Sequence, residues 1–169
     1  RGLYNNDYIE LTVDKVENIY KEGGTILYSS NKDNLFDYLV DDGHGGKVKK
    51  DVSDVAVENL KKRGIEGLIV IGGDGSFHGA HYLYEEHGIK TIGIPGTIDN
   101  DIAGTDYTIG YDTALNIILD AISKLKDTAI SHERTYLVEV MGRNCGDLAL
   151  YSAIAGGASG VMIPRSEER

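Results

Sequence analysis

Apolar residues follow two patterns along this chain, and the two patterns alternate. Short runs rich in Ile, Val and Leu are typical of strands, whereas apolar residues spaced three or four apart are typical of helices. The runs predict strands at residues 25–28, 68–71, 91–94, 135–140 and 160–163. The spaced pattern predicts helices at residues 11–20, 52–63, 76–87, 113–126 and 147–155. Residues 31–50 follow neither pattern, and their glycines and charges predict an exposed loop.

The alternation of strands and helices determines the predicted fold class. It predicts an α/β protein with a mainly parallel sheet, right-handed crossovers and helices on both faces, which is a three-layer, Rossmann-like architecture. We expect one folded domain. In such a sheet the loops that follow the strands gather at one edge, so side chains in those loops are the first candidates for a functional site.

Composition narrows the possible partners. The chain has 169 residues, and its 17 Lys and Arg against 27 Asp and Glu give a formal charge of −10. This charge opposes binding to nucleic acid or to an anionic membrane surface. A single cysteine, Cys145, excludes an internal disulfide, and no apolar stretch is long enough to span a membrane. We therefore expect a cytoplasmic protein that binds neither nucleic acid nor a membrane.

The first candidate motif is Gly72-Gly73-Asp74-Gly75-Ser76, directly after a predicted strand. Glycines allow backbone N–H groups to approach phosphate oxygens, Ser76 can cap a new helix, and Asp74 can hold Mg²⁺. The alternative is a tight turn in which Asp74 is only a solvated cap, and the motif alone does not decide between the two. Its glycine spacing is not the G-x-G-x-x-G of dinucleotide-binding proteins, which disfavours an NAD-linked enzyme.

The second candidate motif contains Thr97, Asp99 and Asp101 and follows the next predicted strand. In an extended loop, residues two apart point to the same side. One carboxylate could then accept a hydroxyl proton while the other orients the acceptor or the surroundings of a metal, as phosphoryl transfer to an alcohol requires. The alternative is a polar turn with no catalytic role.

A third cluster, Met141-Gly142-Arg143, follows the strand predicted at residues 135–140. It offers a guanidinium for phosphate and a glycine for the close approach of a sugar. Arg134 precedes the same strand, where its own context indicates only a surface charge.

Taken together and in order, the motifs resemble the 6-phosphofructokinase family. The matching segments are residues 72–76, 95–110, 131–134 and 138–144. The resemblance covers the whole chain and corresponds to about half of a family subunit. It implies that residues 1–169 are a nucleotide-binding α/β domain that lacks the family's N-terminal glycine-rich strand loop and its second, substrate-binding half.

The resemblance implies an activity. It would be phosphoryl transfer from ATP with Mg²⁺ to the 1-hydroxyl of fructose 6-phosphate, giving fructose 1,6-bisphosphate in glycolysis. The whole enzyme would be a homotetramer, and we expect this chain by itself to be nearly inactive.

The same resemblance assigns roles at the nucleotide. Asp74 would hold Mg²⁺ at the ATP phosphates. The residues that would line the nucleotide site are Gly73, Gly75, Ser76 and Gly79.

At the sugar hydroxyl that accepts the phosphoryl group, the resemblance implies that Asp99 is the general base. Thr97 would contact the transferring group, and Asp101 would support the base and the metal environment. These residues would also bind substrate, and Arg143 would join them as a catalytic residue.

Binding of the sugar phosphate is assigned, again by resemblance, to Met141, Gly142 and Arg143. Arg134 would reach the 6-phosphate in a neighbouring subunit, which implies an oligomeric active site.

Gly75 and Gly96 favour ATP as the donor, because pyrophosphate-using relatives carry larger residues at these positions, typically Asp and Lys. Asn31 stands where ATP-using members place Arg, and it mildly favours the alternative of a pyrophosphate-dependent enzyme. Lys32 could compensate as a point charge. A further alternative is a noncatalytic nucleotide-binding module.

Overall fold

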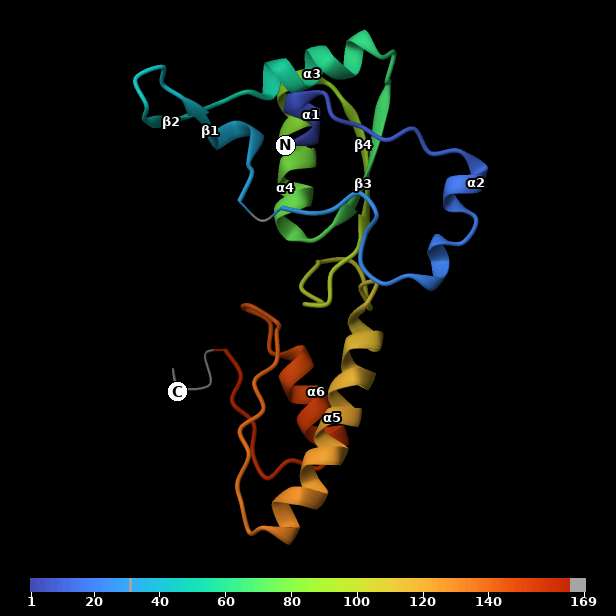
Figure 1. The fold of residues 1–169 in the computed structure, drawn as a ribbon, viewed down its shortest axis with the longest axis vertical. Helices are drawn as coiled ribbons and strands as arrows, with labels where there is room; N and C mark the ends of the chain where they lie inside the picture. Colours follow the sequence, from blue (N-terminus) through green and yellow to red (C-terminus); the bar gives the residue numbers. More distant parts are fainter. Residues whose placement is uncertain (31, 165–169) are drawn as a thin grey trace. The chain divides into compact units, whose positions relative to one another are not determined.

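A computed structural model describes residues 1–30 and 32–164 of the chain. Figure 1 shows its helices and strands along the sequence. The helices are α1 (Gly2–Asn5), α2 (Val13–Val16), α3 (Ser53–Lys62), α4 (Asp74–His87), α5 (Tyr111–Ser131) and α6 (Asp147–Gly156). The strands are β1 (Tyr38–Asp41), β2 (Lys47–Lys50), β3 (Gly67–Gly72) and β4 (Lys90–Pro95). Two short 3₁₀ turns are η1 (Ile19–Lys21) and η2 (Leu35–Asp37).

The chain divides into two compact units. The first contains Arg1–Ile69 and His78–Ile92, and the second contains Val70–Phe77 and the chain from Gly93 onward. The division passes through β3, α4 and β4, so each unit is described by itself.

β3 and β4 form a parallel pair, as the sequence predicts. At their beginnings, a Cβ on Gly67 would lie 3.2 Å from the carbonyl oxygen of Lys90, and at their ends the Gly96 N–H donates to the Gly72 carbonyl over 3.0 Å. The first residues of the two strands are neighbours, and so are their last residues, so the two strands run parallel. With helices beside this pair, the predicted α/β class is confirmed.

In the first unit, the core lies between α3 and α4. It consists of Val57 and Leu60 from α3, with Leu83 and Ile89 from α4 and the turn after it. Leu68 of β3 packs against this cluster. Asp51 stabilises the first turn of α3, because its carboxylate accepts a hydrogen bond from the Ser53 N–H over 2.8 Å.

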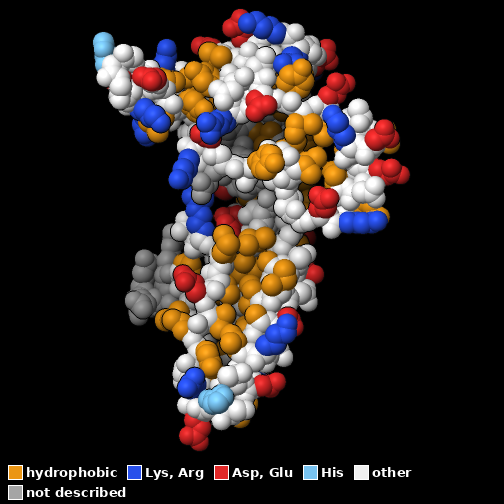
Figure 2. Space-filling model, viewed as in Figure 1, with side chains coloured by type: hydrophobic (Ala, Val, Ile, Leu, Met, Phe, Trp, Pro, Cys, Tyr) orange, Lys and Arg blue, Asp and Glu red, His pale blue; other side chains and the backbone are white. Residues whose placement is uncertain are grey.

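In the second unit, α5 and α6 pack side by side (Figure 1). Gly156 permits the close approach, because a Cβ there would lie 2.9 Å from Cγ2 of Ile122. Leu148 of α6 and Tyr111 of α5 are buried. Outside this contact, Figure 2 shows apolar side chains on the face over α5, and Ile117 is among the exposed ones. No helix in the described part of the chain is long and apolar enough to cross a membrane.

The predictions of strands at residues 25–28, 135–140 and 160–163 are wrong for this structure, in which these segments are turn or irregular chain. A strand requires a neighbour for its N–H and C=O groups, and the apolar run alone does not supply one. Leu137, which would sit in the middle of one such strand, is 82% exposed.

The loop predicted at residues 31–50 instead contains the antiparallel hairpin β1–β2, with Tyr38 opposite Lys50 and Asp41 opposite Lys47. Its turn is organised by Asp42, whose carboxylate accepts from the N–H groups of His44 and Gly46. The helix predicted at residues 11–20 is replaced by α2 and the separate turn η1. The other four predicted helices are confirmed within a few residues of their ends.

The bond from Ser53 to Asp51 generates a test of stability. The Ser53 side chain, followed by its backbone N–H, lowers the pKa of Asp51 below its usual value. The ionised carboxylate therefore stabilises the fold above the usual carboxyl pKa, and this stabilisation is lost as the pH falls through the lowered pKa. We expect Asp51→Ala to reduce the free energy of unfolding at neutral pH by less than about 1 kcal/mol, because solvent screens the exposed carboxylate, and we expect the difference to fade in acid. Urea unfolding across pH measures it.

The matched control is Asp33→Ala, because the exposed Asp33 carboxylate makes no hydrogen bond or ion pair with any described residue. Equal losses in the two variants, or a loss for Asp51→Ala that does not depend on pH, would contradict the explanation.

Candidate active site

The turn from β3 into α4 brings backbone N–H groups to the end of the sheet. The N–H groups of Ser76 and Phe77 both donate to the Gly73 carbonyl, over 3.0 and 3.1 Å, so α4 begins at Asp74. Ser76 therefore lies inside the first turn and not at the cap position that the sequence predicts. Gly72 is required here, since a Cβ would lie 2.5 Å from Oγ of Ser76. The start of a helix of this length carries partial positive charge and suits an anion.

The loop after β4 lies against this turn. The hydrogen bond from the Gly96 N–H to the Gly72 carbonyl ties the two strand ends together. A Cβ on Gly73 would lie 3.4 Å from Cβ of Thr97, so the two loops lie close together at this point. The structure thus brings the first two sequence motifs to the same edge of the sheet.

Asp99 lies at the centre of the charged groups in the second loop. Its backbone N–H donates to Oγ1 of Thr97 over 3.2 Å, and its carboxyl is half-buried. Burial raises the pKa of Asp99 above its usual value, the Asp101 charge raises it further, and the Arg143 guanidinium lowers it. The structure therefore brings Arg143, which lies far along the chain from this loop, within electrostatic range of Asp99 and adds it to the acidic pair.

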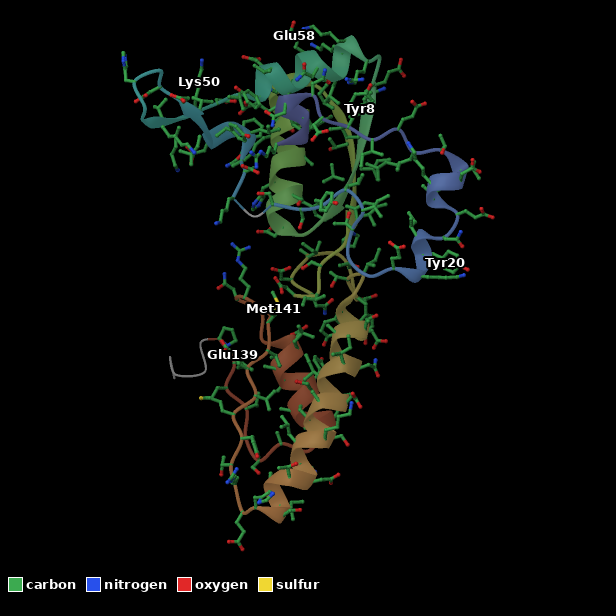
Figure 3. All side chains as sticks on the ribbon, in the orientation of Figure 1. Tyr8, Tyr20, Lys50, Glu58, Glu139 and Met141 are labelled. Carbon is green, nitrogen blue, oxygen red and sulfur yellow. The ribbon has the colours of Figure 1, made fainter. Side chains whose placement is uncertain are left out.

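The third motif forms a strained turn. Gly142 is buried and has a φ of 145°, and a Cβ there would lie 2.7 Å from the carbonyl oxygen of Cys145. Arg143 adopts a φ of 52°, in the left-handed region that side chains seldom occupy. Strained backbone conformations of this kind cluster at functional sites, where the strain can be part of the mechanism. Met141, labelled in Figure 3, is 74% exposed and available to a ligand.

Two predicted residues are not brought into this group. Arg134 is exposed just beyond α5, where its N–H donates to the Ala129 carbonyl. Gly79 lies on α4 in the first unit, and a Cβ there would meet no atom within 4 Å. Their predicted roles at the sugar phosphate and the nucleotide stay predictions.

Sequence reasoning missed Asn100, which lies between the two acidic residues of the second loop. Its amide bonds to Thr108 and to Asp147. The sequence feature that could have indicated Asn100 is its residue type, because Asn is one of the residues other than glycine that adopt a left-handed backbone most often.

A divalent cation fits the donor chemistry of the turn. Asp74 is exposed at the start of α4, and carboxylate oxygens are the ligands that Mg²⁺ prefers. The described residues contain no group of three or more His, Cys, Asp or Glu arranged to hold a metal. Mg²⁺ is commonly held by one or two carboxylates together with substrate phosphates, and Asp74 suits that arrangement.

A parallel strand pair with glycine-rich loops at its end, a helix start and clustered acidic residues is typical of α/β proteins that bind nucleotide phosphates. The sequence model of one family, described as phosphofructokinase, matches residues 1–169. The chain belongs to the phosphofructokinase family.

Curated relatives agree with this membership. The chain is 56% identical over 164 residues to "ATP-dependent 6-phosphofructokinase 2" of Clostridium perfringens, covering 97% of this chain and 44% of the relative. It is 51% identical over 166 residues to "ATP-dependent 6-phosphofructokinase" of Fusobacterium nucleatum, covering 98% and 48%. The chain therefore spans about half the length of the curated relatives it matches.

Solved structures show the same fold. Phosphofructokinase from Saccharomyces cerevisiae matches with a TM-score of 0.55 and 38% identity, covering 64% of this chain and 17% of that chain. Pichia pastoris phosphofructokinase in the T-state matches with a TM-score of 0.61 and 30% identity, covering 66% and 13%.

The raised pKa of Asp99 generates a prediction about stability. A carboxyl whose pKa is higher in the folded state favours folding when protonated, and this contribution is lost as the pH rises through the raised pKa. At neutral pH the ionised Asp99 therefore opposes folding. We expect Asp99→Asn to raise the free energy of unfolding at neutral pH and to leave it unchanged well below the usual carboxyl pKa. Urea unfolding at both pH values measures the difference.

Asp106→Asn is the matched control, because it makes the same change of charge in the same loop at an exposed carboxylate that no hydrogen bond or ion pair among the described residues engages. A destabilised Asp99→Asn chain at neutral pH would show that the carboxylate is favourably held.

Proposed function

We propose that the protein containing this chain transfers the γ-phosphoryl group of ATP to the 1-hydroxyl of fructose 6-phosphate. The names of the relatives, which are 51–56% identical, support this activity. The observation in the structure that carries the proposal is the half-buried Asp99 carboxylate, with Asp101 and Arg143 close enough to change its pKa.

The chain can bind the donor at the start of α4. Anionic phosphates suit the helix start, where Gly73 and Gly75 let a ligand approach the backbone and Ser76 offers a hydroxyl. A Cβ on Gly75 would meet no atom within 4 Å, so this position is open. Asp74 would hold Mg²⁺, which when bound neutralises negative charge on the donor phosphates.

Asp99 acts as the general base. Its carboxylate accepts the proton of the 1-hydroxyl while that oxygen forms a bond to the γ-phosphorus and the bond from phosphorus to the β,γ-bridging oxygen breaks, which releases ADP. Burial and the Asp101 charge raise the pKa of Asp99, and a higher pKa makes a stronger base. Thr97 accepts a hydrogen bond from the Asp99 backbone N–H and lies close to Gly73 of the donor turn, which supports a role for it in contacting the transferring group.

Arg143 supplies positive charge at the same centre, which suits the negative charge of a transferring phosphoryl group. Met141 and Gly142 precede it in the strained turn and would contact the sugar phosphate. Arg134 would bind the 6-phosphate in a neighbouring subunit of a homotetramer, and we place the protein in the cytoplasm.

The glycines at two positions support ATP rather than pyrophosphate as donor. Larger residues at positions 75 and 96 accompany the use of pyrophosphate. Gly75 leaves open space, and a Cβ on Gly96 would lie only 2.9 Å from Cγ2 of Ile71, so a side chain there requires the Ile71 side chain to move. Asn31, which mildly favoured pyrophosphate, lies outside the described residues.

The role of the base is tested by Asp99→Asn in a chimera in which residues 1–169 replace the matching part of the C. perfringens relative. We expect formation of ADP that depends on fructose 6-phosphate to fall on the order of 10³-fold or more, because the amide cannot accept the proton. ATP binding, measured by calorimetry, should stay within about twofold, since Asp99 acts on the acceptor.

The control is Asp106→Asn in the same chimera, which should keep full turnover. A chimera that binds ATP and never transfers phosphate would instead support the noncatalytic nucleotide-binding module.

The choice of donor is tested by Gly75→Asp. The open space predicts that the chain still folds, while the new carboxylate repels the donor phosphates at the start of α4. We expect ATP affinity to fall at least tenfold, which is about 1.4 kcal/mol, with no loss of thermal stability.

Gly160→Asp makes the same change of charge at another glycine whose Cβ would meet no atom within 4 Å, so ATP affinity should not change. If the chimera without substitutions turns over faster with pyrophosphate than with ATP, the assignment of ATP as the donor is wrong.

A further inference from the structure

Asn100 has an unusual backbone conformation at the centre of the second loop. It lies between Asp99 and Asp101 with a φ of 55°, in the left-handed region. A residue in this conformation turns the chain sharply, and Asn tolerates it better than most side chains. This tolerance alone could explain the residue, so its side-chain bonds decide whether it does more.

The carbonyl side of the Asn100 amide is bound to the far end of its own loop. Its Oδ1 accepts from the Thr108 N–H over 3.0 Å and from the Thr108 hydroxyl over 3.4 Å, and Thr108 is only 4% exposed. The next residue, Ile109, donates its N–H to the Pro95 carbonyl over 2.7 Å. The loop is thus closed onto the end of β4 by a backbone hydrogen bond next to the buried Thr108.

The amino side of the same amide is bound to a different element. Its Nδ2 donates to Oδ2 of Asp147 over 3.1 Å, in addition to a longer bond of 3.5 Å to the Asp106 carbonyl in its own loop, and Asp147 is the first residue of α6. Burial is the main cause of the raised pKa of Tyr111, and the Asp147 charge raises this pKa further, so Asp147 lies close to a buried side chain. The Asn100 side chain therefore joins the acidic loop to the beginning of a helix.

We propose that Asn100 is a positioning residue for the Asp99 base, holding the acidic loop against Thr108 on one side and Asp147 on the other. The proposal rests on the role of Asp99 in the proposed function. Asp99 precedes Asn100 directly, so the depth of its carboxyl in the protein depends on the path of the backbone at Asn100.

The first test is Asn100→Gly, which keeps the left-handed backbone accessible and removes both side-chain contacts. In the 169-residue chain, ¹³C NMR should show the pKa of Asp99 falling toward its usual value as the carboxyl gains solvent. In the chimera, kcat should fall on the order of 10- to 100-fold, with the KM for ATP within about twofold, because the base is displaced and the donor site is not.

The matched control is Asn6→Gly. Asn6 also has a left-handed backbone, with a φ of 56°, and its Oδ1 accepts a hydrogen bond from Nε of Arg63 over 2.7 Å. Asn6 lies in the first unit, so Asn6→Gly should leave both the Asp99 titration and kcat unchanged.

A second test exchanges the two partners. Asn100→Asp keeps the acceptor for Thr108 but places a carboxylate against Asp147, so kcat should fall as it does in Asn100→Gly. Adding Asp147→Asn restores a donor and an acceptor in exchanged places, and the double variant should recover most of kcat. A residue needed only for its backbone conformation would show no such recovery.

A folded Asn100→Gly chain with unchanged Asp99 titration and unchanged kcat overturns the proposal, and so does a double variant no better than Asn100→Asp. If Asn100→Gly does not fold, Asp147→Ala removes one end of the same contact and is judged by the same two measurements. If the chimera without substitutions transfers no phosphoryl group, the proposed function is wrong. The proposal for Asn100 is then still decided by the NMR titration, which measures whether Asn100 positions Asp99.

Discussion

The candidate site depends on the hydrogen bond from the Gly96 N–H to the Gly72 carbonyl. This bond continues the parallel pairing of β3 and β4 to the last residues before their loops. Beyond it, Thr97 lies close to Gly73 in the donor turn. Asp74 follows one strand end and Asp99 follows the other, so this pairing relates the helix start that suits phosphates to the loop that carries the acid.

Several energetically unfavourable features occur at the residues of the candidate site. Asn100 and Arg143 have left-handed backbones, and Gly142 has a φ that a larger residue would resist. Asp99 is half-buried beside another carboxylate, which raises its pKa. None of these features favours folding, and such features persist where function requires them.

Local patterns predicted part of the local structure. The helices that became α3 to α6 and the strands β3 and β4 follow from apolar spacing within each segment. Residues 135–140 have an equally apolar sequence but form no strand, because pairing depends on a neighbouring chain that the pattern does not specify. The hairpin β1–β2 was missed because glycines and charges surround its short strands.

The same limit applies to the site. The glycine turn and the acidic pair were recognisable, since each is a short run directly after a predicted strand. Asn100 was not, because its importance depends on Thr108 and Asp147, which lie 8 and 47 residues further along the chain. A loop that carries a base needs support from an element more rigid than itself, and here a helix start provides it. A negative charge at that position is favourable for α6 in its own right. Asp147 thus serves the helix and the loop with one side chain, so the contact to Asn100 adds no buried charge to the site.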